Sequence, residues 1–193
     1  MSGVYYHASP IEGLTQLEPR ISNHGVPLVY LSKKRENVLV YLSNAVEKFC
    51  NDTGFSYAGQ WHKWGPYGFD EDGCIRLEEY YPDALESTYR GVSGYIYSVD
   101  KIFDFGYELN IPNAATSSVA VSVSGVEYVP DTYEEILKAE KDGLIRITRF
   151  EEMTENKKNW LKRIIAEEYD QAEDHPEYRY FLRNKFPEYT DGE

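Results

Sequence analysis

The chain opens with a short β-prone run that ends in a histidine and a serine. Residues Val4–Ser9 include a valine and two tyrosines, and Pro10 follows them directly, so a first strand is expected here. A strand that finishes on His7 and Ser9 is a candidate functional site. The alternative is structural, because a single histidine at a strand end commonly serves only to satisfy a neighbouring polar group.

Composition limits the classes of partner. The 193 residues suffice for one domain with a sizeable core and a helical extension. With 20 Lys and Arg against 33 Asp and Glu, the net charge of −13 argues against sequence-independent capture of nucleic acid through its phosphates, while a local basic pocket for a small nucleotide stays open. Cys50 and Cys74 lack metal-type spacing, so no metal site is predicted. Two thiols, no signal peptide and no membrane-length apolar run indicate a reduced, cytoplasmic setting and no membrane contact.

Periodicity predicts an α+β fold. Strands are expected at 4–9, 28–32, 94–99, 119–123, 126–129 and 144–150, with 119–129 alternatively forming one strand bulged at Ser124-Gly125. Helices are expected at 33–50, within 75–89, and at 132–141, 154–169 and 176–186. Residues 10–27 read as a long irregular connection, and residues 51–73 as strands joined by turns or as a loop over a site.

We therefore expect a domain over residues 1–150 and a C-terminal helical extension over 151–193. The helix at 154–169 carries Trp160, Leu161 and Ile165 on one face. That apolar face must pack on the sheet or on a second protomer, so a homodimer through this helix is one prediction.

Three side chains in the predicted elements carry specific expectations. Ser32 ends the second strand and can cap the helix that follows it, while Tyr41 lies beside the apolar stripe of that helix. Glu127 stands inside an otherwise apolar strand. Because burying an isolated carboxylate is costly, Glu127 must be exposed at an edge, paired, or part of a site.

Two further patterns favour ordinary roles. Trp61 and Trp64 are candidates for a stacking platform, but buried anchors of an ordered loop are the preferred interpretation. The acidic residues 70–72 precede Gly73, and their spacing fits no twelve-residue Ca²⁺ loop, so a solvated turn is predicted.

The remaining constellation matches a known pattern. Gly-rich phosphate loops, nucleophile elbows and zinc-protease motifs are missing from the sequence. What remains is His7-Ala8-Ser9, Tyr30-Leu31-Ser32, Tyr41 and Glu127. This set resembles the ADP-ribosyltransferase fold of the diphtheria-toxin and poly(ADP-ribose) polymerase type, whose signature is a His, Tyr and Glu triad. In that family a first strand ends in His-Gly-Ser or His-Gly-Thr, a second ends in Tyr and small residues, and a second Tyr lies in the next helix.

The resemblance implies a split β-sheet core with flanking helices, and NAD as the substrate. It assigns His7 to the adenosine ribose, and Ser9 with the backbone of Ala8 to the nicotinamide amide. Tyr30 and Tyr41 would hold the nicotinamide ring by stacking. Ser32, one of the small residues after Tyr30, is counted with these NAD-binding residues.

Glu127 is the catalytic residue that the resemblance implies. The Glu-Tyr-hydrophobic context of the family's glutamate is similar to Val126–Val129. Breaking the glycosidic bond of NAD passes through an oxocarbenium-like state. A carboxylate that bonds the ribose hydroxyl next to nicotinamide would favour that positive charge.

The sequence departs from the family pattern at two positions. Ala8 replaces the usual glycine, and Gly125 stands where arginine-modifying relatives carry Gln or Glu. The second departure argues against arginine as the acceptor, and it leaves an NAD-binding relative with little or no transferase activity as an alternative.

Three functions follow as hypotheses. The first is ADP-ribosyl transfer, with a possible protein acceptor, or NAD glycohydrolysis. The second is removal of an RNA 2′-phosphate with NAD, which the acidic charge disfavours. The third is a non-catalytic interaction protein of the same fold, which binds a partner through a Tyr-rich cleft or the C-terminal helix.

Overall fold

The computed structural model describes residues 3–21, 25–59, 67–107 and 109–190 and confirms an α+β protein with mostly antiparallel sheets. Trp61 and Trp64 lie outside these residues. The chain forms two compact units. The first contains the residues up to Leu42, Gly68–Arg76 and Tyr89–Arg146; the second contains Ser43–Tyr67, Leu77–Thr88 and the residues from Ile147 onward. The boundary predicted at residue 150 stays a prediction; in the compact units, the C-terminal helices share a unit with earlier segments.

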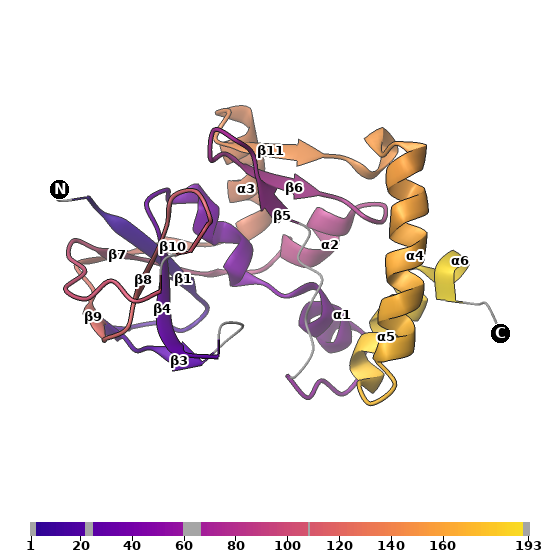
Figure 1. Cartoon of the computed structure of the whole chain (residues 1–193), viewed down its shortest axis with the longest axis horizontal. Helices are drawn as coiled ribbons and strands as arrows, with labels where there is room; N and C mark the ends of the chain where they lie inside the picture. The colour runs from indigo at the N-terminus through magenta and orange to yellow at the C-terminus, as the bar shows by residue number, and fades with distance from the viewer. Residues whose placement is uncertain (1–2, 22–24, 60–66, 108, 191–193) are drawn as a thin grey trace. The chain divides into compact units, whose positions relative to one another are not determined.

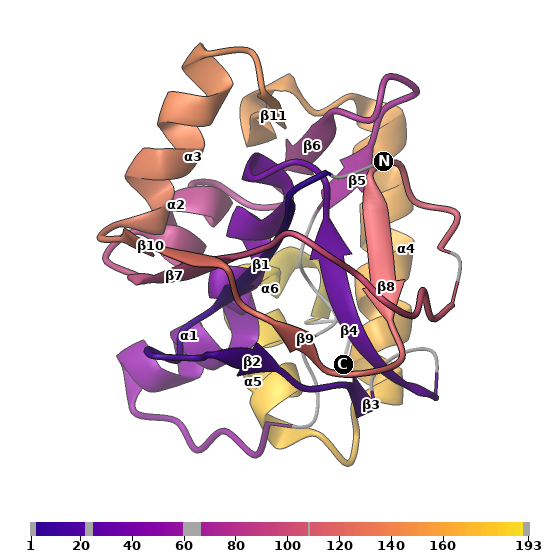
Figure 2. The ribbon, with the colours of Figure 1, turned by 90° about the vertical axis from the view of Figure 1, so that its left-hand side faces the viewer.

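The main sheet belongs to the first unit. In it β10 pairs with β7, β7 with β1 and β1 with β4, and β4 also pairs with β3 and β8 (Figure 2). Its strands are β1 (Tyr5–Ser9), β3 (Arg20–Ile21), β4 (Pro27–Ser32), β7 (Gly94–Val99), β8 (Ala114–Ser117) and β10 (Gly125–Val129). Two short strands, β2 (Gln16–Leu17) and β9 (Val121–Ser122), pair separately. All of these pairs are antiparallel.

One face of this sheet carries the core of the first unit. Apolar side chains alternate along the strands, as expected for a half-buried sheet. The cluster consists of Tyr5, Leu17, Val29, Leu31, Tyr97, Val99, Ala115 and Val121. We call this side of the sheet the Tyr97 face and the other side the Ile96 face.

The Ile96 face is covered by a 3₁₀ helix. This helix, η1 (Glu36–Leu42), contacts β1, β7 and α3 (Thr132–Lys141). Gly94 lies two residues before Ile96, and a Cβ there would come within 2.5 Å of Leu42 Cδ2. The missing side chain at Gly94 therefore lets η1 approach the strand closely.

Most predicted strands of this unit are confirmed, and the connections hold more structure than expected. The irregular connection at 10–27 contains β2 and β3, and β8 was not predicted. Asp131 caps α3, because its Oδ1 accepts hydrogen bonds from Tyr133 N at 2.9 Å and Glu134 N at 3.2 Å.

The helix predicted over 33–50 is wrong. The segment forms η1 and then a separate helix, α1 (Ala45–Thr53), which Asn44 caps by accepting from Val46 N at 3.0 Å. Ser32 caps no helix, and its Oγ accepts from Lys34 N at 3.1 Å in a tight turn. The cause is local, since a capping asparagine inside the segment starts a new helix there.

A three-stranded sheet in the order β11-β6-β5 contains the points at which the chain passes from one unit to the other. Its strands are β5 (Tyr67–Phe69), β6 (Ile75–Glu78) and β11 (Ile145–Thr148). The helix predicted within 75–89 is only α2 (Ala84–Tyr89), because residues 75–78 alternate between buried and partly buried positions as a strand does.

The second unit is built from helices. In Figure 1 its long helix, α4, runs beside α5 and α6. The elements are α1, η2 (Phe150–Glu152), α4 (Glu155–Gln171), α5 (Pro176–Lys185) and α6 (Pro187–Thr190). No helix in the described ranges combines the length and apolar character that a bilayer crossing requires.

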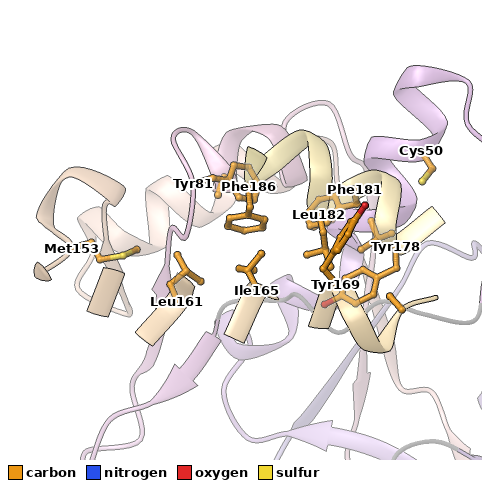
Figure 3. Close-up of a cluster of buried hydrophobic side chains, with 14 residues drawn as sticks. Cys50, Tyr81, Met153, Leu161, Ile165, Tyr169, Tyr178, Phe181, Leu182 and Phe186 are labelled. Carbon is orange, nitrogen blue, oxygen red and sulfur yellow. The ribbon is translucent and has the colours of Figure 1, made fainter. Parts of the chain in front are cut away.

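The core of the second unit joins α1, α4 and α5. Leu161 and Ile165 of α4 and Phe181 of α5 are completely buried, and Figure 3 shows Ile165 facing the ring of Phe186. The apolar face of α4 is thus covered within the chain. The homodimer through this helix stays a prediction, and it would have to use other residues.

Truncation of Phe181 should destabilise the second unit strongly. Phe181→Ala is expected to lower the free energy of unfolding by about 3–5 kcal/mol, because it removes a fully buried ring and leaves a cavity. Urea denaturation measures the change. Phe103→Ala is the matched control, since Phe103 is 82% exposed and should cost less than about 0.5 kcal/mol. Equal losses in the two variants contradict this core.

Candidate functional site

The candidate site begins where β1 and β4 separate. The two strands pair at one position, Tyr6 with Ser32. Beyond it, His7 Nδ1 donates a hydrogen bond to the backbone carbonyl of Tyr30 at 2.9 Å. A side chain therefore replaces the backbone ladder, and we call this place the β1–β4 junction. Because a carbonyl only accepts, Nδ1 carries the proton, and Nε2 of a neutral ring is an acceptor.

Strand β3 lies along the same edge of β4 as β1. Arg20 and Ile21 of β3 pair with Leu28 and Pro27. Antiparallel pairs alternate between hydrogen-bonded and non-hydrogen-bonded, and Pro27 has no N–H, so Arg20 with Leu28 is the hydrogen-bonded pair. Along a strand, the backbone N–H and C=O groups of every second residue point to the same edge. The backbone groups of Leu28 and Tyr30 therefore point to one edge of β4, so β3, which bonds Leu28, and β1, whose His7 bonds Tyr30, lie along that edge.

The junction is a gap in this edge. Leu28 pairs with β3 and Ser32 pairs with β1, and these two residues are four positions apart. That distance is about 13 Å along a strand. Within it, the hydrogen bond from His7 is the link between the described strands on this edge.

The imidazole of His7 is kept neutral. Burial lowers the pKa of His7, the positive charge of Arg20 acts in the same direction, and the hydrogen bond to Tyr30 acts against them. None of the described residues bonds Nε2. A ligand hydroxyl or amide N–H can donate to that nitrogen.

The strand register separates His7 from Glu127. His7 lies opposite Tyr97, whereas Glu127 lies opposite Ile96, which in turn lies opposite Ala8. Directly opposite residues of antiparallel strands share a face. The side chain of His7 therefore points to the Tyr97 face and that of Glu127 to the Ile96 face.

Glu127 is an exposed, ion-paired residue of the edge strand β10. Arg35, just before η1, binds it through two bonds, Nε to Oε2 at 2.9 Å and Nη2 to Oε1 at 2.5 Å. Arg35 Nη2 also lies 3.1 Å from Glu135 Oε1 of α3. The Arg35 guanidinium holds the pKa of the Glu127 carboxyl below its usual value. From the sequence, Glu127 is expected to be exposed at an edge, paired, or part of a site. The first two of these expectations are confirmed.

The other predicted residues are spread around the junction. Ala8 is buried, and Ser9 Oγ accepts from Ile11 N at 3.2 Å. Tyr30 is partly buried and lies opposite Thr116 of β8. Tyr41 is 53% exposed on η1. The structure thus brings His7 to the backbone of Tyr30, while Glu127 is held by Arg35 on the other face.

The acidic turn at residues 70–72 forms ion pairs with an arginine. Arg146 lies 2.5 Å from Asp70 and 2.6 Å from Asp72. Its hydrogen bonds to Asp72, together with the bond from the backbone N–H of Cys74, lower the pKa of Asp72 to about 2. Among the residues with described positions, no group of three or more His, Cys, Asp or Glu side chains is arranged to hold a metal ion.

Sequence reasoning missed Arg20, Arg35 and Asn37. Arg35 ends the basic run that begins at Lys33, directly before η1, and a buried or edge glutamate needs such a partner. The Asn37 side chain is buried, and both amide atoms lack a partner among the described residues. No sequence signal marks that position.

Comparison of the chain with models of known protein families, with curated proteins and with solved structures finds no match.

The protonation of His7 gives a direct check of this geometry. Nitrogen NMR should show the neutral tautomer with the proton on Nδ1 and a pKa below the usual 6.5. The unfolded chain then binds the proton more readily, so His7 makes stability fall as the pH drops below about 6.5. His7→Gln should flatten the decrease between about pH 7 and pH 5. A tautomer protonated on Nε2, or a raised pKa, contradicts the junction.

Proposed function

We propose that this chain binds NAD, or a nucleotide related to it, at the β1–β4 junction. The single observation that carries the proposal is His7. Its ring is held neutral, Nδ1 is fixed on Tyr30, and Nε2 has no partner among the described residues. A ribose hydroxyl is a donor that suits this nitrogen.

The split-sheet fold of the ADP-ribosyltransferase type is part of the proposal. It is supported by the single bridge between Tyr6 and Ser32. That bridge nearly divides the main sheet into β10-β7-β1 and the strands around β4. The residues at the division are those that the resemblance assigns to NAD.

The geometry supports binding better than ADP-ribosyl transfer or NAD glycohydrolysis. For either reaction, the Glu127 carboxylate would have to leave Arg35 and reach a ribose held by His7 on the other face of the sheet. We therefore take nucleotide binding as the function and Glu127 as the ion-pair partner of Arg35. A protein acceptor is relevant only if transfer is observed.

A second candidate, the interaction protein, rests on β10. This strand ends the main sheet, and its Val126 and Tyr128 side chains are 61% and 56% exposed on the Tyr97 face. Exposed apolar side chains on a terminal strand are typical of sites that bind another chain. One variant distinguishes NAD binding at the junction from partner binding at β10. Val126→Thr should weaken partner binding and leave the affinity for NAD unchanged.

Titration of NAD into the purified protein tests the proposal. The wild type should bind, and His7→Ala should weaken binding about 3- to 10-fold, the effect of one hydrogen bond. Glu127→Gln should bind NAD as the wild type does. Absence of wild-type binding overturns the proposal.

The same samples are assayed for released nicotinamide. No release is expected from the wild type. Release by the wild type that Glu127→Gln abolishes, with binding intact, would establish the catalytic role that the resemblance assigns to Glu127 and contradict our ion-pair assignment.

A further inference from the structure

Tyr169, near the end of α4, contacts two arginines of α5. Tyr169 is buried and belongs to the apolar core of the second unit (Figure 3). The guanidinium carbon of Arg179 lies 4.2 Å from the centre of its ring, and that of Arg183 lies 5.7 Å from it. Arg183 Nη2 also donates a hydrogen bond to the Tyr169 hydroxyl. We call these three residues the Tyr169 cluster.

The helix brings the two arginines of the cluster together. Arg179 and Arg183 are four positions apart on α5, so their side chains lie on the same face of this helix. Because both guanidinium carbons lie close to one ring centre, they are at most about 10 Å apart, which is about the Debye length at 0.1 M salt. Dissolved salt therefore does not fully screen the repulsion between the two positive charges.

The positive charge of the cluster is not neutralised by described carboxylates. Asp170, Glu173 and Asp174 are close in sequence, but within the described ranges no carboxylate lies at ion-pair distance from Arg179 or Arg183. Four other arginines of this acidic protein do form such pairs, namely Arg35, Arg76, Arg90 and Arg146. Arg179 Nε is buried and has no hydrogen-bond partner among the described residues. The cluster thus presents two positive charges to an anion.

A phosphate dianion matches these donors. A phosphate monoester carries a charge of about −1.5 to −2 at neutral pH and three strong acceptor oxygens. It can accept hydrogen bonds from two guanidinium groups at once, whereas a carboxylate carries a single charge and is matched by one guanidinium. The contacts with Tyr169 hold both arginine side chains in place, which lowers the entropic cost of binding.

We propose that the Tyr169 cluster binds a phosphate dianion through Arg179 and Arg183, either as the free ion or as the monoester of a phosphorylated protein side chain. This site goes beyond the function proposed above and does not rest on it. NAD carries its two phosphates in a diphosphate bridge with one charge on each, and it lacks the dianion that the arginine pair fits.

Titration with inorganic phosphate and with a short phosphoserine peptide of otherwise neutral residues tests the proposal, with the arginine Nε–H resonances as the readout. The wild type should bind both, with shifts at Arg179 and Arg183, and should not bind the unphosphorylated peptide. Arg179→Gln and Arg183→Gln should each weaken binding about tenfold or more, because each removes a charge-assisted hydrogen bond. The matched control is Arg163→Gln, which removes the same charge from an exposed residue of α4 outside the cluster and should leave both affinities unchanged.

A purely structural role predicts different results. If the arginines serve only to hold α5 against α4, the wild type binds neither probe, and that outcome overturns the proposal. An equal loss of affinity in Arg163→Gln and in the cluster variants would show a general effect of charge and also overturn it. Should the glutamine variants fail to fold, Arg183→Lys keeps the charge without the planar donors and should still weaken binding about threefold or more; an unchanged affinity contradicts the site.

The same titrations identify the source of the phosphate and separate this site from the junction. Tighter binding of the peptide than of inorganic phosphate supports a phosphorylated protein segment as the ligand, and equal affinities support the free ion. NAD binding should be the same in Arg179→Gln as in the wild type. If NAD does not bind at all, the proposed function fails while the phosphate site stands.

Discussion

The hydrogen bond from His7 to the Tyr30 carbonyl is the interaction on which the site depends. It lies where the ladder between β1 and β4 stops, and it links the side chain of β1 to the backbone carbonyl of Tyr30 in β4. The same bond fixes the tautomer of the ring. His7 therefore has a structural role, as the alternative in the sequence analysis predicted, because its Nδ1 bonds the Tyr30 carbonyl. This role leaves its Nε2 as an acceptor for a ligand.

The two faces of the main sheet pack against different parts of the chain. The Tyr97 face buries the apolar cluster of the first unit, whereas the Ile96 face receives η1, with Gly94 allowing the close approach of Leu42. Arg35 joins the start of η1 to β10 and α3 through Glu127 and Glu135. Such partly exposed pairs contribute at most about 1 kcal/mol each, so we regard this cluster as fixing geometry more than stability.

How much the sequence predicts depends on the range of the interactions. Alternating or helical patterns locate β1, β4, β7 and α3 because they reflect local burial, and Asp131 marks its helix because capping is local. The break at Asn44 was missed because the apolar pattern continues across it. The sequence could not predict that His7 and Glu127 lie on opposite faces of the sheet. That assignment requires the register of β7 with both β1 and β10, and a shift of one residue in either pairing would move the side chain to the other face.

The central claim is that the nucleotide binds Nε2 of His7 at the junction, and the nitrogen spectrum of His7 during NAD addition tests it most directly. The resonance of His7, assigned with His7→Gln, should shift at Nε2 as that atom accepts a hydrogen bond from the ligand. Nδ1 should keep its proton and its bond to Tyr30. Binding of NAD that leaves Nε2 unchanged, or that moves the proton from Nδ1, would contradict the account.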